Sequence, residues 1–170
     1  MTCTTCSACA AASNDCCHLR GDPLFRFGLT KADLERITRR TGVHASEWTD
    51  TDVVPEHVLE VLRVGAPGIE RQFPGGQRVA LRFDGHARAC TWLGPAGCTL
   101  DRDTRPRTCA LYPYWQVDGV VTGVVSHPGR CRVLREGGLD RTHLERVAVL
   151  AEAELVANQV SETARVSGYQ

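Results

Sequence analysis

The segment CTLDRDTRPRTCALYP, residues 98–113, places two cysteines and three arginines in one short stretch. Its Arg-Pro step restricts the backbone just ahead of Cys109, because a proline fixes its own φ and limits the residue before it. Guanidinium groups close to a cysteine lower the pKa of the thiol and favour its use as a ligand. We therefore interpret this segment as part of a metal-binding site and not as an ordinary turn.

Cysteine is the residue type that departs most from an ordinary composition, with nine in a chain of 170 residues. The N-terminal part has no basic region followed by an apolar run, so we expect no secretory signal and a cytoplasmic location. An odd number of cysteines in a reducing compartment argues against a disulfide framework. It favours metal or redox chemistry instead.

The first cysteine block lies in residues 1–20, a cysteine-rich lead with little apolar content. It contains the overlapping pairs Cys3-x2-Cys6-x2-Cys9 and then the adjacent Cys16 and Cys17. A Cys-x2-Cys turn directs two thiolates to one metal ion. Adjacent cysteines point in different directions and suit a cluster or two neighbouring metals. Since hydrophobic burial cannot order such a segment, we expect a metal to organise it.

The second cysteine block is dispersed along the chain and consists of Cys90, Cys98, Cys109 and Cys131. For Cys90, within an alternating stretch, a buried apolar thiol is the alternative interpretation. His18 and His127 lie close to cysteines in the sequence and are alternative ligands, although a lone histidine is more often a surface or capping residue.

The basic residues are nineteen arginines and Lys31, and the formal net charge is zero. A neutral chain is not expected to bind nucleic acid. We expect Arg105, Arg107 and Tyr112 to surround the thiolates, because a thiolate-bound metal carries negative charge that cations and N–H donors offset. A solvated charged loop and, for the tyrosine, core packing are the alternatives, and a codon bias would also enrich arginine.

The pattern predicts an α+β fold in a single domain, residues 1–170, in which a small antiparallel sheet or hairpins pack against helices around a cysteine-rich, metal-stabilised core. Helices are predicted at 30–42, 55–65 and, as a long C-terminal helix, 140–166. The last has Leu144, Val147, Ala151 and Leu155 on one face. No apolar run approaches the roughly 20 residues of a membrane span.

Two hairpins are predicted from turn signals. The first joins residues 78–85 and 87–94 around Asp84-Gly85, and the second spans 113–125 with its turn at Asp118-Gly119. Asp-Gly between alternating apolar residues favours a two-residue turn.

Several short motifs occur in a recognisable order. They are CSAC (Cys6, Cys9), CC (Cys16, Cys17), LTKADLERI (29–37), CTWL (Cys90), GC (Cys98), RPRTC (Arg105, Pro106, Cys109), YP (Tyr112, Pro113) and the late Cys131. In this order the chain resembles the YkgJ-type cysteine-cluster family, described as a zinc- or iron-chelating CxxCxxCC domain.

The resemblance implies eight metal ligands: Cys6, Cys9, Cys16, Cys17, Cys90, Cys98, Cys109 and Cys131. Cys3 would be an extra cysteine. Six residues, AAASND, separate Cys9 from Cys16, where the family usually has two. Which of Cys3, Cys6 and Cys9 is the spare cysteine is therefore left open.

The sequence favours a metal-binding protein whose cysteines ligate an iron–sulfur cluster, with zinc as the alternative metal. Adjacent and dispersed cysteines suit a polynuclear centre better than two tetrahedral zinc sites. One alternative is a small metalloenzyme whose open iron site acts on a small carboxylate, an amino-acid-like substrate or a methyl donor. A second is a zinc-stabilised interaction module. Beyond metal ions and such a substrate, the sequence names no partner and indicates no membrane contact.

Overall fold

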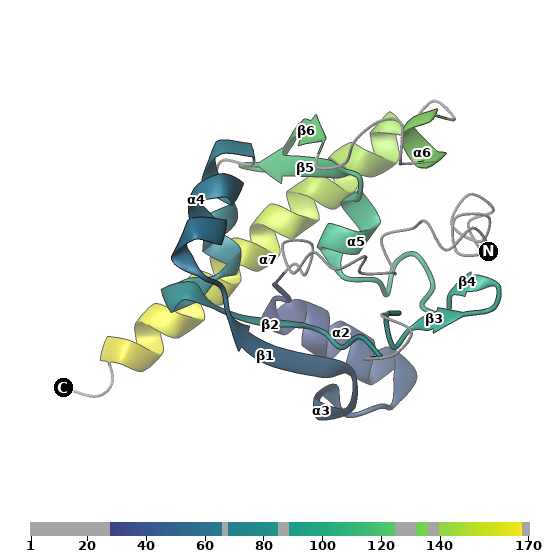
Figure 1. Ribbon diagram of the computed structural model, residues 1–170, viewed down its shortest axis with the longest axis horizontal. Coiled ribbons are helices and arrows are strands. Elements are labelled where there is room, and N and C mark those ends of the chain that lie inside the picture. Colours follow the sequence, from purple (N-terminus) through teal and green to yellow (C-terminus); the bar gives the residue numbers. More distant parts are fainter. Residues whose placement is uncertain (1–27, 66–67, 85–88, 125–131, 136–139, 168–170) are drawn as a thin grey trace.

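The computed structural model of the chain describes residues 28–65, 68–84, 89–124, 132–135 and 140–167 (Figure 1). Within them helices and short strands are intermixed, which confirms the predicted α+β class. The helices are α2 (Lys31–Thr41), α3 (Ala45–Trp48), α4 (Glu56–Gly65), α5 (Arg107–Leu111), α6 (Arg132–Arg135) and α7 (Arg141–Ser167), with short 3-10 helices η2 (Ile69–Gln72) and η3 (Pro74–Gly76). The strands are β1 (Thr49–Val53), β2 (Gln77–Leu81), β3 (Leu93–Gly94), β4 (Gly97–Cys98), β5 (Tyr114–Val117) and β6 (Val120–Val124).

Helix α2 begins and ends where its sequence predicts. Thr30 is the N-cap, and it forms a capping box in which its hydroxyl accepts from the backbone N–H of Asp33 while the Asp33 carboxylate accepts from the backbone N–H of Thr30. Gly42 ends the helix with φ 73°, a left-handed conformation that costs glycine little.

The described strands form three separate two-stranded antiparallel sheets, and not one small sheet. The longest pair joins β1 to β2, from Thr49 opposite Leu81 to Val53 opposite Gln77. Arg78 is buried and donates to both carboxylate oxygens of Asp52, over 2.6 and 3.1 Å. This ion pair fixes the register across the two strands.

The first predicted hairpin is confirmed in part. Phe83 bridges Cys90, Asp84 N donates to Ala89 O over 2.8 Å, and Thr91 N donates to Arg82 O over 3.0 Å. Residues 77–81, however, pair with β1, whose sequence TDTDV has no alternating apolar pattern to reveal it as a strand. Residues 93–94 pair with 97–98 instead.

The second predicted hairpin is confirmed as β5 and β6. Asp118 and Gly119 both adopt positive φ, 50° and 77°, as a two-residue hairpin turn requires. A Cβ at Gly119 would also approach Val149 Cα to 3.6 Å, so the turn lies directly against α7.

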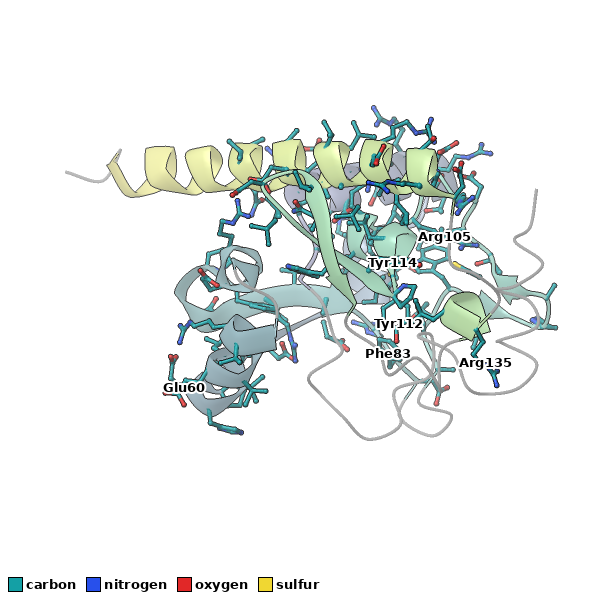
Figure 2. All side chains as sticks on the ribbon, turned by 90° about the horizontal axis from the view of Figure 1, so that it is seen from above. Glu60, Phe83, Arg105, Tyr112, Tyr114 and Arg135 are labelled. Carbon is teal, nitrogen blue, oxygen red and sulfur yellow. The ribbon has the colours of Figure 1, made fainter. Side chains whose placement is uncertain are left out.

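Helix α7 has 27 residues and spans the molecule, with the strands on one side of it (Figure 2). The predicted C-terminal helix is therefore confirmed. Leu144, Val147, Ala151 and Leu155 are all 5% exposed or less, so the predicted apolar face is the buried one.

The apolar interior is divided among three clusters of buried residues. They are Val54, Val58, Leu59, Phe73 and Trp115; Ala110, Leu111, Leu144, Val147, Ala148 and Ala151; and Ile37, Trp48 and Leu100. Cys98 packs against the edge of the third cluster, together with Leu29 and Trp92.

Candidate metal centre

Three of the nine cysteines belong to the described residues, and each lies on a different element. Cys90 forms the bridge with Phe83, Cys98 ends β4, and Cys109 lies in α5. Cys90 is 6% exposed, whereas Cys98 and Cys109 are half-buried. We refer to residues 89–113, which contain all three, as the thiol segment.

The other predicted ligands lie outside the described residues. They are Cys3, Cys6, Cys9, Cys16, Cys17, Cys131, His18 and His127. Within the part of the chain that the structure describes, no three or more His, Cys, Asp or Glu side chains form a group that could hold a metal ion. A metal centre involving Cys90, Cys98 or Cys109 would therefore draw on those other residues, and the eight-cysteine ligand set stays a prediction.

Backbone hydrogen bonds bring the positions of Cys90 and Cys98 together. Leu93 N donates to Cys90 O over 2.8 Å, and Leu93 is also the register partner of Cys98. One residue further out, Thr99 N donates to Trp92 O, also over 2.8 Å. This short hairpin places two predicted ligands on neighbouring turns.

An aspartate-capped turn connects Cys98 to Cys109. Asp101 Oδ1 accepts from the backbone N of Thr104 at 3.0 Å and from its hydroxyl at 2.6 Å, and Asp101 Oδ2 accepts from Arg40 Nε at 3.0 Å. The hydrogen bonds from Thr104 and Arg40 lower the pKa of Asp101 to about 2. The Asp101 carboxylate therefore holds the backbone turn that leads to Arg105.

The side chain of Arg105 binds the backbone, and the side chain of Arg107 binds a carboxylate. Arg105 is 9% exposed, and its Nε donates to Leu100 O over 3.1 Å. The Nε of Arg107 donates to Glu154 Oε1 of α7 over 2.9 Å, so a carboxylate meets its charge. Half-buried Tyr112 follows α5, and Figure 2 labels both it and Arg105. Their predicted role around a metal remains a prediction.

The side chain of Asp33 joins α2 to α5. Its Oδ2 accepts from Thr30 N at 3.0 Å, and its Oδ1 accepts from Arg107 N at 3.1 Å and from Arg36 Nη2. The side chain is 2% exposed. Burial raises the pKa of Asp33, while Arg36 opposes that shift. Since the amides and the guanidinium direct hydrogens at it, this geometry suits an ionised carboxylate.

Two glutamates of α7 make ion pairs on different flanks of the helix. Glu154 Oε1 accepts from Arg36 Nη1 at 2.7 Å and from Arg107 Nε, which joins α7 to α2 and α5. Glu152 accepts from Arg71 Nη1 at 2.5 Å and from Gln116 Nε2 at 3.2 Å, which joins α7 to η2 and β5. The two side chains are similarly buried, 14% and 18% exposed. Only the Glu154 flank contacts the thiol segment through these bonds.

Two buried polar atoms of the thiol segment make no hydrogen bond with the described residues. They are Trp92 Nε1 and Thr108 Oγ1. The Trp92 ring packs against Trp48, with ring centroids 5.9 Å apart at 60°. Thr108 directly precedes Cys109, and Trp92 lies two residues after Cys90. Both therefore bring an unsatisfied donor close in sequence to a predicted ligand.

Asp33 and Glu154 were missed as site residues by the sequence analysis. One signal was present: Pro106 precedes α5 and has no side chain that can accept a hydrogen bond from the first amides of the helix. An acceptor from elsewhere in the chain was therefore required. Nothing in the local sequence identifies that acceptor as a residue 74 positions away.

No family model matches this chain, and neither a curated protein nor a solved structure shows significant similarity to it. Among the described helices, none combines the length and the apolar character that crossing a membrane requires.

Proposed function

We propose that this chain is a thiolate metal-binding protein whose cysteines hold an iron–sulfur cluster, with zinc as the alternative metal. We also propose that it is a member of the YkgJ-type cysteine-cluster family that its motifs resemble. The ligands would be Cys6, Cys9, Cys16, Cys17, Cys90, Cys98, Cys109 and Cys131. A bound cluster would supply electron transfer or structural stability.

The observation that carries this proposal is that two buried donors close in sequence to predicted ligands, Trp92 Nε1 and Thr108 Oγ1, make no hydrogen bond with the described residues. A buried donor without an acceptor costs about 1–3 kcal/mol, so native proteins rarely leave one. Sulfur atoms of a thiolate-ligated cluster accept hydrogen bonds, and such bonds tune the cluster. Donors beside Cys90 and Cys109 in the sequence fit a sulfur-rich group bound there.

Charge provides further support. The Arg105 side chain is 9% exposed, so it keeps a positive charge inside the protein four residues ahead of Cys109. A buried cation lowers the free-energy cost of a nearby anion, such as a thiolate or an anionic cluster. Arg105 Nε donates to Leu100 O over 3.1 Å, which fixes this charge close in sequence to Cys109.

Three serine variants test the proposal. Cys98→Ser and Cys109→Ser are expected to lose metal, measured as iron, zinc and acid-labile sulfide per chain after anaerobic purification. Cys3→Ser is the matched control and is expected to keep its metal. Full metal content in both of the first two variants would contradict the ligand assignment. An iron with a non-cysteine ligand, detected by Mössbauer spectroscopy, would favour the metalloenzyme alternative.

A further inference from the structure

The N-terminus of α5 has no capping side chain of its own. Its N-cap is Pro106, which makes no side-chain cap. The first amide of the helix, Arg107 N, donates instead to Asp33 Oδ1 over 3.1 Å, across 74 positions of sequence. The helix that carries Cys109 is therefore capped by a residue of α2.

Asp33 serves both helices with a single carboxylate. Its Oδ2 accepts from the backbone and the hydroxyl of Thr30, over 3.0 and 3.1 Å, which caps α2. Its Oδ1 accepts from Arg107 N and from the Arg36 guanidinium. An asparagine amide would direct hydrogens at one of these donor groups, so it cannot replace the carboxylate without loss.

Arg36 and Glu154 complete this arrangement. Arg36 Nη2 donates to Arg105 O over 3.2 Å, and Glu154 Oε1 accepts from Arg36 Nη1 and Arg107 Nε. The Arg-Pro-Arg step is thus held at a carbonyl, at an amide and at a side chain, by residues of α2 and α7. These contacts end two residues before Cys109, inside a helix of five residues.

We infer that Asp33 is a positioning residue for Cys109: its carboxylate, supported by Arg36 and Glu154, fixes the orientation of α5 and thereby the direction in which the Cys109 thiol points. The consequence for metal affinity rests on the proposed function. Asp33 does not touch the metal in this arrangement and acts through the backbone of Arg107. Residues that orient metal ligands typically change metal affinity about 10–100-fold when they are replaced.

The test compares Asp33→Asn and Glu154→Gln with the control Glu152→Gln. The control removes an ion pair of similar burial from the same helix, on the flank that does not contact α5. Two quantities are measured on the full chain. One is the rate of iodoacetamide labelling at Cys109 after metal removal, resolved by peptide mass mapping. The other is the rate of metal release to a chelator.

We expect Asp33→Asn and Glu154→Gln to increase the rate of metal release about 10–100-fold and to increase the labelling rate of Cys109 as well. Glu152→Gln should leave the labelling rate and the metal-release rate within about twofold of the native chain. This holds even if it lowers the melting temperature as much as the other two variants do. Equal effects in all three variants, or unchanged labelling in the first two, would overturn the inference, since the role would then be general stability. Should Asp33→Asn fail to fold, Glu154→Gln decides the question.

The labelling measurement also separates this inference from the proposed function. Faster labelling of Cys109 in a chain that never binds metal would support the positioning role and would overturn metal binding. Bound metal, with unchanged labelling and unchanged metal release in the variants, would support metal binding and would overturn the positioning role.

Discussion

Helix α7 and the thiol segment differ in what holds them in place. Helix α7 is one continuous helix of 27 residues with a buried apolar face. The thiol segment contains only the two-residue strands β3 and β4 and the five-residue helix α5 as regular elements. Its shape depends on side chains that accept hydrogen bonds from its backbone amides, chiefly those of Asp101 and Asp33.

Both regions contain buried polar atoms that make no hydrogen bond with the described residues: Trp92 Nε1 and Thr108 Oγ1 in the thiol segment and His143 Nε2 on α7. On α7, Glu152 accepts from two side chains and Glu154 from three. The difference between the regions therefore lies in the extent of regular structure and apolar burial, and it teaches that the thiol segment depends more on individual side chains.

Metal removal is expected to produce the largest difference between the two regions, measured as the rate of amide hydrogen exchange. After chelation, amides of the thiol segment such as Thr99 N and Ala110 N should exchange about 100-fold faster. That factor corresponds to the stability lost when a ligand present at about 100 times its Kd is removed. Hydrogen exchange with mass spectrometry should find the amides of α7 unchanged. Equal loosening of both regions would contradict the distinction between them.

Protonation of Asp101 at low pH is expected to have a smaller effect, measured on the free energy of unfolding. Its folded pKa of about 2 lies below the ordinary value of 3.8, so its contribution is complete above about pH 4 and is lost as the pH falls toward 2. Because its side chain is 43% exposed, solvent screening limits this contribution to about 0.5–1 kcal/mol. Urea unfolding of the metal-free chain and of Asp101→Asn should differ by that amount at about pH 6 and converge near pH 2.

Asp103→Asn is the matched control for this titration. Asp103 lies two residues away and is 87% exposed, so its replacement should change stability little at any pH. A constant difference between the native chain and Asp101→Asn from pH 6 to pH 2 would show that the Asp101 charge does not hold the turn.

The smallest change in stability is expected for Thr108→Val in the metal-free chain. Valine keeps the branched shape and removes a buried hydroxyl that makes no hydrogen bond with the described residues, so the free energy of unfolding should stay equal or rise slightly. Thr104→Val, which loses the hydrogen bond from its hydroxyl to Asp101, should instead cost about 1 kcal/mol.

In the metal-loaded protein, Thr108→Val should shift the visible absorption. A destabilised metal-free variant would indicate that the hydroxyl has a protein partner.

Local features of the fold could be predicted from the sequence, because each depends on a few neighbouring residues. Thr30 and Gly42 bound α2, and Asp118-Gly119 forms the turn between β5 and β6, as expected. The β1–β2 pairing could not be predicted, since TDTDV carries no apolar alternation and its partner lies more than twenty residues away.

The candidate site was predictable only in its residue types. The motifs LTKADLERI and RPRTC were both noticed, but their contact through Asp33 and Arg107 depends on tertiary structure. Asp33 belongs to a capping box, a role that by itself explains an aspartate at this position. Its second role, at α5, becomes visible only when the two segments are packed together.

The measurement that tests the central claim most directly is the iron, zinc and acid-labile sulfide content of the anaerobically purified chain, with its visible absorption spectrum. The proposal predicts a brown protein with about equal iron and sulfide, since each iron of a [2Fe–2S] or [4Fe–4S] cluster is matched by one sulfide. One or two zinc ions without sulfide would replace the cluster by the zinc alternative. A chain that contains neither metal, and that takes up neither when reconstituted, would contradict the claim.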